Sequence, residues 1–231
     1  MASAAVAEQR KIIDAAAKAG VKRFLPSEYG TNTANAEILK VSKFSASKAD
    51  VTEYLKQTNA TNPGLTWTSV IVGPFFDWNI KSGSLGFGIS SGTATIFDGG
   101  DKRFSTTNLA TIGRAVASVL AHPAETANKH VYVSSFNTTQ NEILSSLEKA
   151  TQKTWTIKQR TTKEAMATGA EKLASGDRSG FYDMVLGITY GDGYGTDFAK
   201  DTTDGLSNEL LALPKEELDV VIKEIVEGKR P

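Results

Sequence analysis

Lys48 is the residue whose position in this sequence points most directly to chemistry. Residues 41–57 have the apolar spacing of a helix, and at about 100° of rotation per residue Lys48 falls on the same stripe as Phe44, Val51 and Leu55. A lysine that points from such a stripe into a cleft is partly desolvated, which lowers its pKa toward the range of proton transfer. A lysine that snorkels along the edge of the core has the same spacing. The helical pattern alone leaves both interpretations open.

Two loops that follow predicted strands carry the other candidate site residues. The strand expected at 21–25 is followed by Pro26, Ser27 and Tyr29, and the strand expected at 66–72 is followed by Gly73, Pro74, Phe75, Phe76 and Trp78. Ligands of open parallel sheets bind outside the carboxyl ends of the strands. We therefore expect the Ser27 hydroxyl to face a site, and Tyr29 and the three aromatic residues after the second strand to line an apolar pocket. An ordinary turn and ordinary core residues fit the same segments.

Composition excludes several classes of function. The 231 residues contain 26 Lys plus Arg, 26 Asp plus Glu and no cysteine. The balanced charge gives no electrostatic footprint for nucleic acid or for an anionic membrane. The lack of cysteine excludes disulfides, thiolate metal sites and a cysteine nucleophile. No apolar stretch reaches membrane-spanning length and no apolar signal core follows Met1, so a cytoplasmic protein is expected.

Neither the histidines nor the glycine clusters indicate a second kind of site. His122 and His130 stand at an expected helix end and strand start, and we expect no metal site at either. The glycine-rich segments 83–88 and 191–195 do not match the G-x-G-x-x-G turn and do not lie between a strand and a helix. The sequence therefore contains no recognisable phosphate cradle.

The elements that would position these residues alternate in the manner of an α/β protein. Helices are expected at about 4–19 with Gly20 as the C-terminal cap, at 41–57, along Leu109, Ile112, Val116 and Leu120, after capping boxes at Thr139 and Thr161, and from Pro214 onward. Strands are expected at 21–25, 66–72, 93–97 and 131–133, and loops at 31–38 and 79–92. The helix–strand rhythm predicts βαβ units and a parallel sheet.

Several segments together resemble a known family. Residues 19–30, AGVKRFLPSEYG, are closely similar to the AGVKRF-PSE-G signature of NmrA-like and isoflavone-reductase-like proteins, which are atypical short-chain dehydrogenases/reductases. The likeness continues through Trp67-Thr68, Gly73 to Asp77, Asp98 to Gly100, Ile112 to Val116 and Leu213 to Glu216. It covers essentially the whole chain.

The resemblance implies a fold and a set of roles. The fold would be a truncated Rossmann-like parallel sheet with helices on both faces at residues 1–78. Residues 79–231 would supply closing strands and helices of the sheet and a C-terminal α+β substrate lobe. The activity would be an NADPH-dependent reduction of a small aromatic substrate. Lys48 matches the family's proton-transfer lysine, which favours the cleft interpretation, and Ser27 would be a positioning hydroxyl. Pro26, Ser27, Lys48, Gly73 and Pro74 would border the cofactor.

The sequence departs from the family at two places. Phe44 stands where the wider superfamily has a tyrosine, which removes the phenolic acid. Family members begin with a strand and a G-x-x-G-x-x-G turn that these residues lack, so we expect weak or no NADPH binding by this chain and an exposed sheet edge through which it could form a homodimer. The start could reflect a truncation or a real loss. Two other functions remain open: a non-catalytic regulator that binds a ligand or a protein, and a cofactor-independent isomerase or lyase that uses Lys48.

Overall fold

The molecule has two halves, and a parallel sheet forms the centre of the half that contains Lys48. The computed structural model describes residue 6 and residues 8–230. Its parallel sheet has the order β1-β2-β6, in which Arg23 of β1 pairs with Thr66 of β2, and Ser69 of β2 pairs with His130 of β6. These strands are β1 (Arg23–Phe24), β2 (Thr66–Ile71) and β6 (Lys129–Tyr132). The α/β fold expected from the sequence is confirmed.

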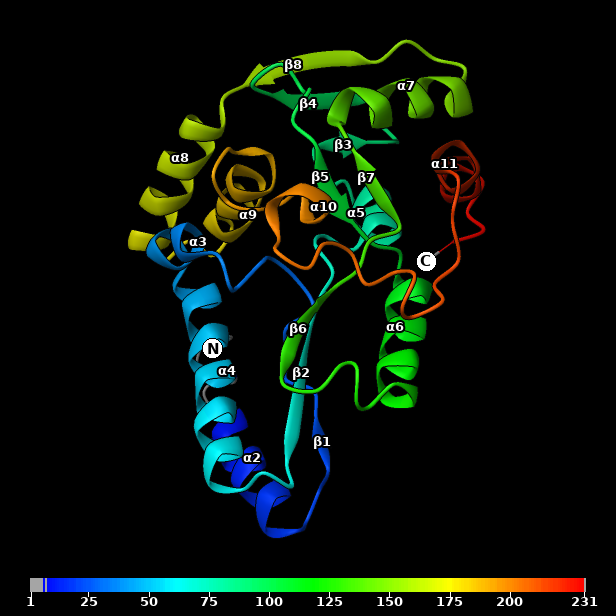
Figure 1. Cartoon of the computed structure of the whole chain (residues 1–231). Helices are drawn as coiled ribbons and strands as arrows, with labels where there is room; N and C mark the ends of the chain where they lie inside the picture. The colour runs from blue at the N-terminus through cyan, green and yellow to red at the C-terminus, as the bar shows by residue number, and fades with distance from the viewer. Residues whose placement is uncertain (1–5, 7, 231) are drawn as a thin grey trace.

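Helices cover both faces of this sheet (Figure 1). On one face α2 (Gln9–Lys18) and α4 (Lys43–Thr61) bury Ile13, Val51 and Leu55 against Trp67 of β2. On the other face α6 (Leu109–Ala121) buries Ile112, Ala115 and Val119 against the strands. Each face is closed by apolar side chains, so β2 is buried along nearly its whole length, including Thr68 and Ser69.

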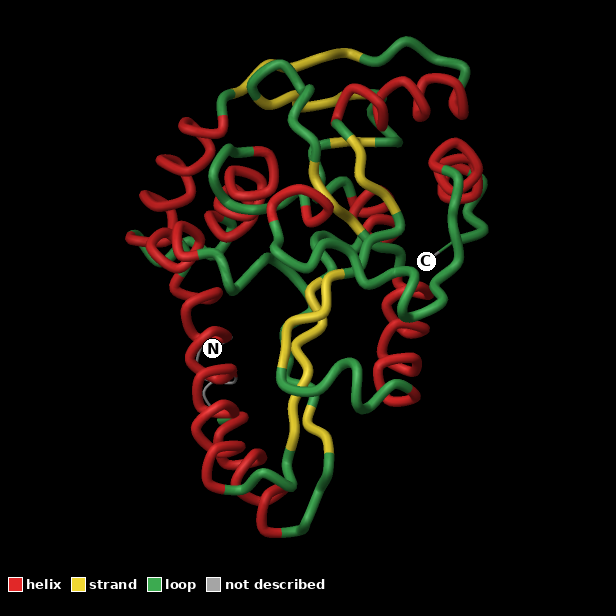
Figure 2. Tube along the Cα trace, viewed as in Figure 1, coloured by secondary structure: helices red, strands yellow, loops and turns green. Residues whose placement is uncertain are grey.

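The second half of the molecule contains two smaller sheets and the remaining helices. Figure 2 shows these strands apart from the parallel sheet. One sheet has the order β3-β4-β8 and the other pairs β5 with β7. The elements are β3 (Phe87–Gly88), β4 (Thr93–Phe97), β5 (Phe104–Thr106), β7 (Phe136–Thr138), β8 (Thr156–Arg160), α5 (Phe76–Ser82), α7 (Gln140–Thr151), α8 (Thr162–Ala174), α9 (Gly180–Tyr190), α10 (Phe198–Asp201) and α11 (Leu218–Val226). Their shared core joins aromatic residues of α5, β3, β4 and β5 to α7 and α11.

The two halves are not consecutive in sequence. The sequence-based domain boundary after residue 78 falls within α5, and β6, from the later part of the chain, completes the parallel sheet. A single cut at this point would therefore divide a helix.

Several element bounds differ from the sequence expectations for local physical reasons. The expected loop at 31–38 contains the start of α3 (Ala36–Val41), because the Asn35 side chain caps the amides of Glu37 and Ile38. The expected loop at 79–92 contains most of α5, which ends at Gly83 in a left-handed conformation. The last helix begins at Leu218 and not at Pro214.

Other sequence expectations are confirmed or lie outside the described residues. Both capping boxes, at Thr139 and Thr161, form as expected, and Gly20 follows α2 in a left-handed conformation. Of the helix expected at 4–19, residues 4, 5 and 7 lie outside the described part of the chain, and α2 spans Gln9–Lys18. In α6 the expected apolar stripe is shifted by about one residue, since Leu120 is exposed and Val119 is buried. Across the described residues, no helix combines the length and the apolarity needed to cross a bilayer.

Candidate functional site

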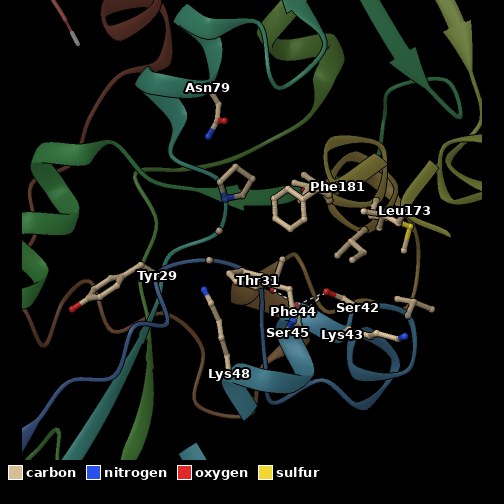
Figure 3. A pocket seen from close by; sticks show the side chains of 18 of the residues that line it. Tyr29, Thr31, Ser42, Lys43, Phe44, Ser45, Lys48, Asn79, Leu173 and Phe181 are labelled. Carbon is tan, nitrogen blue, oxygen red and sulfur yellow. Dashed lines mark hydrogen bonds between the residues drawn. The ribbon is translucent and has the colours of Figure 1, made fainter. Parts of the chain in front are cut away.

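A pocket of about 680 Å³ opens beyond the carboxyl ends of β1 and β2 (Figure 3). One wall is the loop after β1, with Tyr29 to Thr31, and a second is the loop after β2, with Gly73 to Phe75. A third wall is the first turns of α4, where the Ser42 side chain accepts a hydrogen bond from the Ser45 amide and so fixes the start of the helix. The hairpin of α8 and α9 closes the remaining side.

Lys48 extends from α4 toward the two strand-end loops. Its Nζ donates a hydrogen bond to the backbone oxygen of Glu28 and lies 4.8 Å from the centre of the Phe44 ring, one turn earlier on α4. Burial lowers the pKa of the Lys48 ammonium, and the negative charge of Glu28 partly opposes this shift. The lysine is therefore a half-buried pocket residue held by two directional contacts, as the cleft interpretation of its helical position requires.

Glu28 supplies the backbone oxygen that Lys48 contacts. Its side chain is only 2% exposed and accepts hydrogen bonds from Thr33 Oγ1 at 3.0 Å and Thr52 Oγ1 at 3.1 Å. Burial raises the pKa of the Glu28 carboxyl, and Lys48 and the two threonines act in the opposite direction. Because the carboxyl group is anchored on both oxygens, the Glu28 backbone oxygen that receives Lys48 is held in place.

Tight backbone contacts join the two strand-end loops. The Gly73 amide donates to the Gly30 oxygen at 2.9 Å, and the Tyr29 amide donates to the Val70 oxygen at 3.1 Å. Gly73 has φ +65°, and a Cβ at this position would lie 2.2 Å from the backbone oxygen of Ser105. Tyr29 also has a positive φ, 39°, which is uncommon for a residue with a side chain. The local geometry thus demands glycine at position 73.

The hairpin wall of the pocket was not expected from the sequence. Phe181 meets Phe44 edge to face, with ring centres 5.6 Å apart, and Met184, Val185 and Ile188 continue the wall along α9. These four α9 residues have the i, i+3, i+4, i+7 spacing of a helical face, so the periodicity that identified Lys48 could also have identified them.

The structure brings some of the sequence-predicted site residues together and separates others. Lys48, Tyr29, Gly73, Pro74 and Phe75 all line the pocket. Their predicted roles in binding and catalysis stay predictions.

The other four expected site residues lie elsewhere. The Ser27 side chain is exposed outside the pocket, while its amide donates to Gln9 Oε1 at 2.8 Å, and Pro26 is buried beneath the loop. Phe76 is fully buried against Phe136, with ring centres 4.9 Å apart, because the chain turns into α5 at this residue. Trp78 is 55% exposed and does not line the pocket.

The pocket fits an uncharged ring beside a cation. Among the described residues that line it, only Lys43 and Lys48 are charged, and none is acidic. This environment suits an uncharged aromatic ring. The two glycine-rich segments do not open a helix after a strand, because segment 83–88 leads from α5 into β3 and segment 191–195 follows the end of α9.

Comparison with known proteins decides the family. The NmrA-like family profile matches residues 1–174. The chain belongs to the NmrA-like family. Within it, the chain is similar to the oxidoreductase aprR of Aspergillus flavus, with 36% identity over 225 residues that cover 97% of this chain and 74% of the relative.

Solved structures share the fold of this NmrA-like chain. The structure of AtPrR2 with NADP⁺ and (+)pinoresinol has a TM-score of 0.74 at 21% identity, and covers 95% of this chain and 70% of that chain. The leucoanthocyanidin reductase–NADPH complex from Vitis vinifera has a TM-score of 0.75 at 18% identity, with coverage of 97% and 72%. The Rossmann-like architecture implied by the resemblance is confirmed.

Two of the quoted family segments have structural roles. The Asp77 carboxylate is 1% exposed and receives the Leu109 amide at 3.1 Å, which anchors the start of α6. Glu216 accepts hydrogen bonds from Asn108 and Thr111 of the same helix start and from Ser135. Both carboxylates hold the start of α6 in place, and neither lines the pocket.

Proposed function

We propose that the protein is an NADPH-dependent oxidoreductase of the isoflavone-reductase type that acts on a small aromatic substrate. The observation that carries this proposal is the ammonium of Lys48 at the wall of an apolar pocket beyond the carboxyl ends of the parallel strands. The named oxidoreductase relative and the reductase structures with bound NADP⁺ or NADPH support it. Neither the regulator nor the lyase alternative has a separate observation in its favour.

In this reaction the pocket residues of the chain would have separate roles. Lys48 would give or take a proton at Nζ, and its lowered pKa brings this step closer to neutral pH. Phe44, Phe75 and Phe181 would orient the substrate ring and exclude water from it. NADPH, when bound, supplies the hydride. Phe44 has no hydroxyl, so the proton transfer that a tyrosine performs elsewhere in the superfamily falls to Lys48.

The 231-residue polypeptide alone should hold NADPH weakly. Contacts from the pocket to the nicotinamide end alone would have to offset the desolvation and ordering of a large anion. We expect a dissociation constant no tighter than about millimolar, which corresponds to about 4 kcal/mol. A titration followed by nicotinamide fluorescence measures it. Saturation in the micromolar range would show a cofactor site that the described residues do not display.

The function itself is tested by reconstitution. The purified chain is mixed with the amino-terminal strand and glycine-turn segment of a family relative, and NADPH consumption is followed with a panel of phenolic substrates. We expect consumption that needs both the segment and an aromatic substrate. The oxidoreductase proposal is wrong if titrations of the complete mixture show that it binds both NADPH and an aromatic ligand and yet it consumes no NADPH.

A further inference from the structure

A pocket that pairs a desolvated amine with aromatic walls can do more than move protons. Lys48 Nζ reaches the pocket between the loop after β1 and the Phe44 ring, and the pocket volume of about 680 Å³ leaves room for a ring beside it. We propose that Lys48 is a covalent capture site for small aromatic aldehydes, which enter the pocket and form an imine at Nζ. This activity needs no cofactor and does not depend on the proposed function.

The geometry presents Lys48 as a nucleophile. An amine attacks a carbonyl only in its neutral form, and a lysine desolvated in an apolar pocket is neutral more often than one in water. Burial acts on Lys48 in this direction. The Glu28 backbone oxygen accepts one N–H of Lys48, and a neutral amine bound in this way still has its second N–H and its lone pair for reaction.

The titratable groups near Lys48 are Glu28, Lys43 and Tyr29. Glu28, from the loop after β1, is the acidic group whose charge acts on it. Lys43 lies on the same helix, and Tyr29, whose pKa burial raises, is the remaining titratable lining residue. The residues lining the pocket from α9 and from the loop after β2 are uncharged. An uncharged aldehyde is therefore the carbonyl compound that these walls best accept.

The reaction balances without an added reagent. The Lys48 nitrogen adds to the carbonyl carbon and forms a carbinolamine. One N–H proton passes to the carbonyl oxygen as the carbinolamine forms. The resulting hydroxyl then leaves with the second N–H proton as one molecule of water, and a carbon–nitrogen double bond remains. No atom is oxidised or reduced. When the imine is protonated, its one N–H can still donate to the Glu28 oxygen, and its charge still lies over the Phe44 ring.

The second lysine of the pocket is a control within the chain. Lys43 lines the same pocket from the first turn of α4, but its side chain is exposed and the structure gives it no contact with Glu28. An aldehyde that reacts simply with accessible amines will modify Lys43 before Lys48. An aldehyde that first binds among Phe44, Phe75 and Phe181 will modify Lys48 before Lys43.

The experiment uses benzaldehyde with sodium cyanoborohydride, which reduces each imine to a stable benzylamine. Modification of every lysine is followed over time by peptide mass spectrometry of the whole chain. We expect Lys48 to react at least about tenfold faster than Lys43, because bound aldehyde is held beside Nζ. The Lys48 rate should saturate with benzaldehyde and fall when benzyl alcohol, which cannot form an imine, competes for the pocket.

Two variants distinguish reaction of an aldehyde bound in the pocket from reaction at any exposed lysine. Phe181→Ala removes part of the ring wall and should slow modification of Lys48 while leaving that of Lys43 unchanged. Lys48→Arg should abolish the fast, saturable phase. The proposal is overturned if Lys48 in the unmodified sequence reacts no faster than Lys43, or if its faster reaction neither saturates nor responds to benzyl alcohol.

Discussion

Gly73→Ala should destabilise the protein because it disturbs the loop after β2, which forms one wall of the pocket. The added Cβ would lie 2.2 Å from the Ser105 backbone oxygen, and the residue has a left-handed φ of +65°. The Ser105 oxygen cannot move freely, because Ser105 pairs with Asn137 in the β5–β7 ladder and its amide donates to Thr196 at 2.7 Å. The carbonyl would have to retreat by about 1 Å to reach an ordinary contact distance.

The magnitude follows from a comparison with Gly20. Gly20 has a similar φ of +72°, and a Cβ there would have no atom within 4 Å. Gly20→Ala therefore isolates the cost of the left-handed conformation, about 1–2 kcal/mol. Gly73→Ala adds the backbone displacement, and we expect a total loss of about 3–5 kcal/mol in the free energy of unfolding.

Urea unfolding of the three proteins, followed by circular dichroism, measures the two losses. Benzaldehyde capture at Lys48 then reports on the pocket, and it should fall in Gly73→Ala and persist in Gly20→Ala. Equal stability of the two variants would refute the close approach of the loop after β2 to β5, and with it the described position of this wall of the pocket.

Three further predictions concern charge and assembly. Glu28→Gln removes the negative charge that opposes the burial shift, so the pKa of Lys48 should fall further, as measured by the pH dependence of its modification; an unchanged profile contradicts the coupling. Burial lowers the pKa of His130 to about 4, so as the pH falls the unfolded protein protonates this histidine before the folded protein does. The free energy of unfolding should therefore fall by about 3 kcal/mol between pH 6.5 and 4. Urea unfolding at each pH tests this, and His130→Leu should remove this part of the pH dependence. β1 is an edge strand of the described sheet, so the chain should self-associate at micromolar concentration, and sedimentation as a monomer alone would contradict this.

Local patterns in the sequence were sufficient for several parts of this structure. Helical spacing placed Lys48 on one stripe with Phe44, because a helix converts spacing directly into direction. That spacing fitted both a cleft and the edge of the core, and the family resemblance then favoured the cleft. The capping boxes at Thr139 and Thr161 predicted two helix starts, because each is a hydrogen-bond pattern within four residues.

The remaining parts depended on contacts between distant segments. Phe75 and Phe76 are neighbours in sequence, yet only Phe75 lines the pocket, because α5 begins at Phe76 and turns its ring into the core. Ser27 stands at the end of β1 as expected, but the chain turns there so that the Glu28 side chain is buried and the Ser27 side chain is exposed. Phe181 reaches the pocket from more than a hundred residues away in sequence. The helical spacing of α9 indicates an apolar face that includes it, but only the fold shows that this face meets Phe44.

The most direct test of the proposed proton transfer compares two lysines of one pocket. In the reconstituted, NADPH-consuming mixture, kcat is measured for Lys48→Met and for Lys43→Met, with circular dichroism as the check on folding. Loss of a positioned proton-transfer group lowers a rate by about 10²–10⁴-fold, and we expect a loss of that size for Lys48→Met only. A Lys48→Met variant that folds and turns over as fast as Lys43→Met would contradict the role assigned to Lys48.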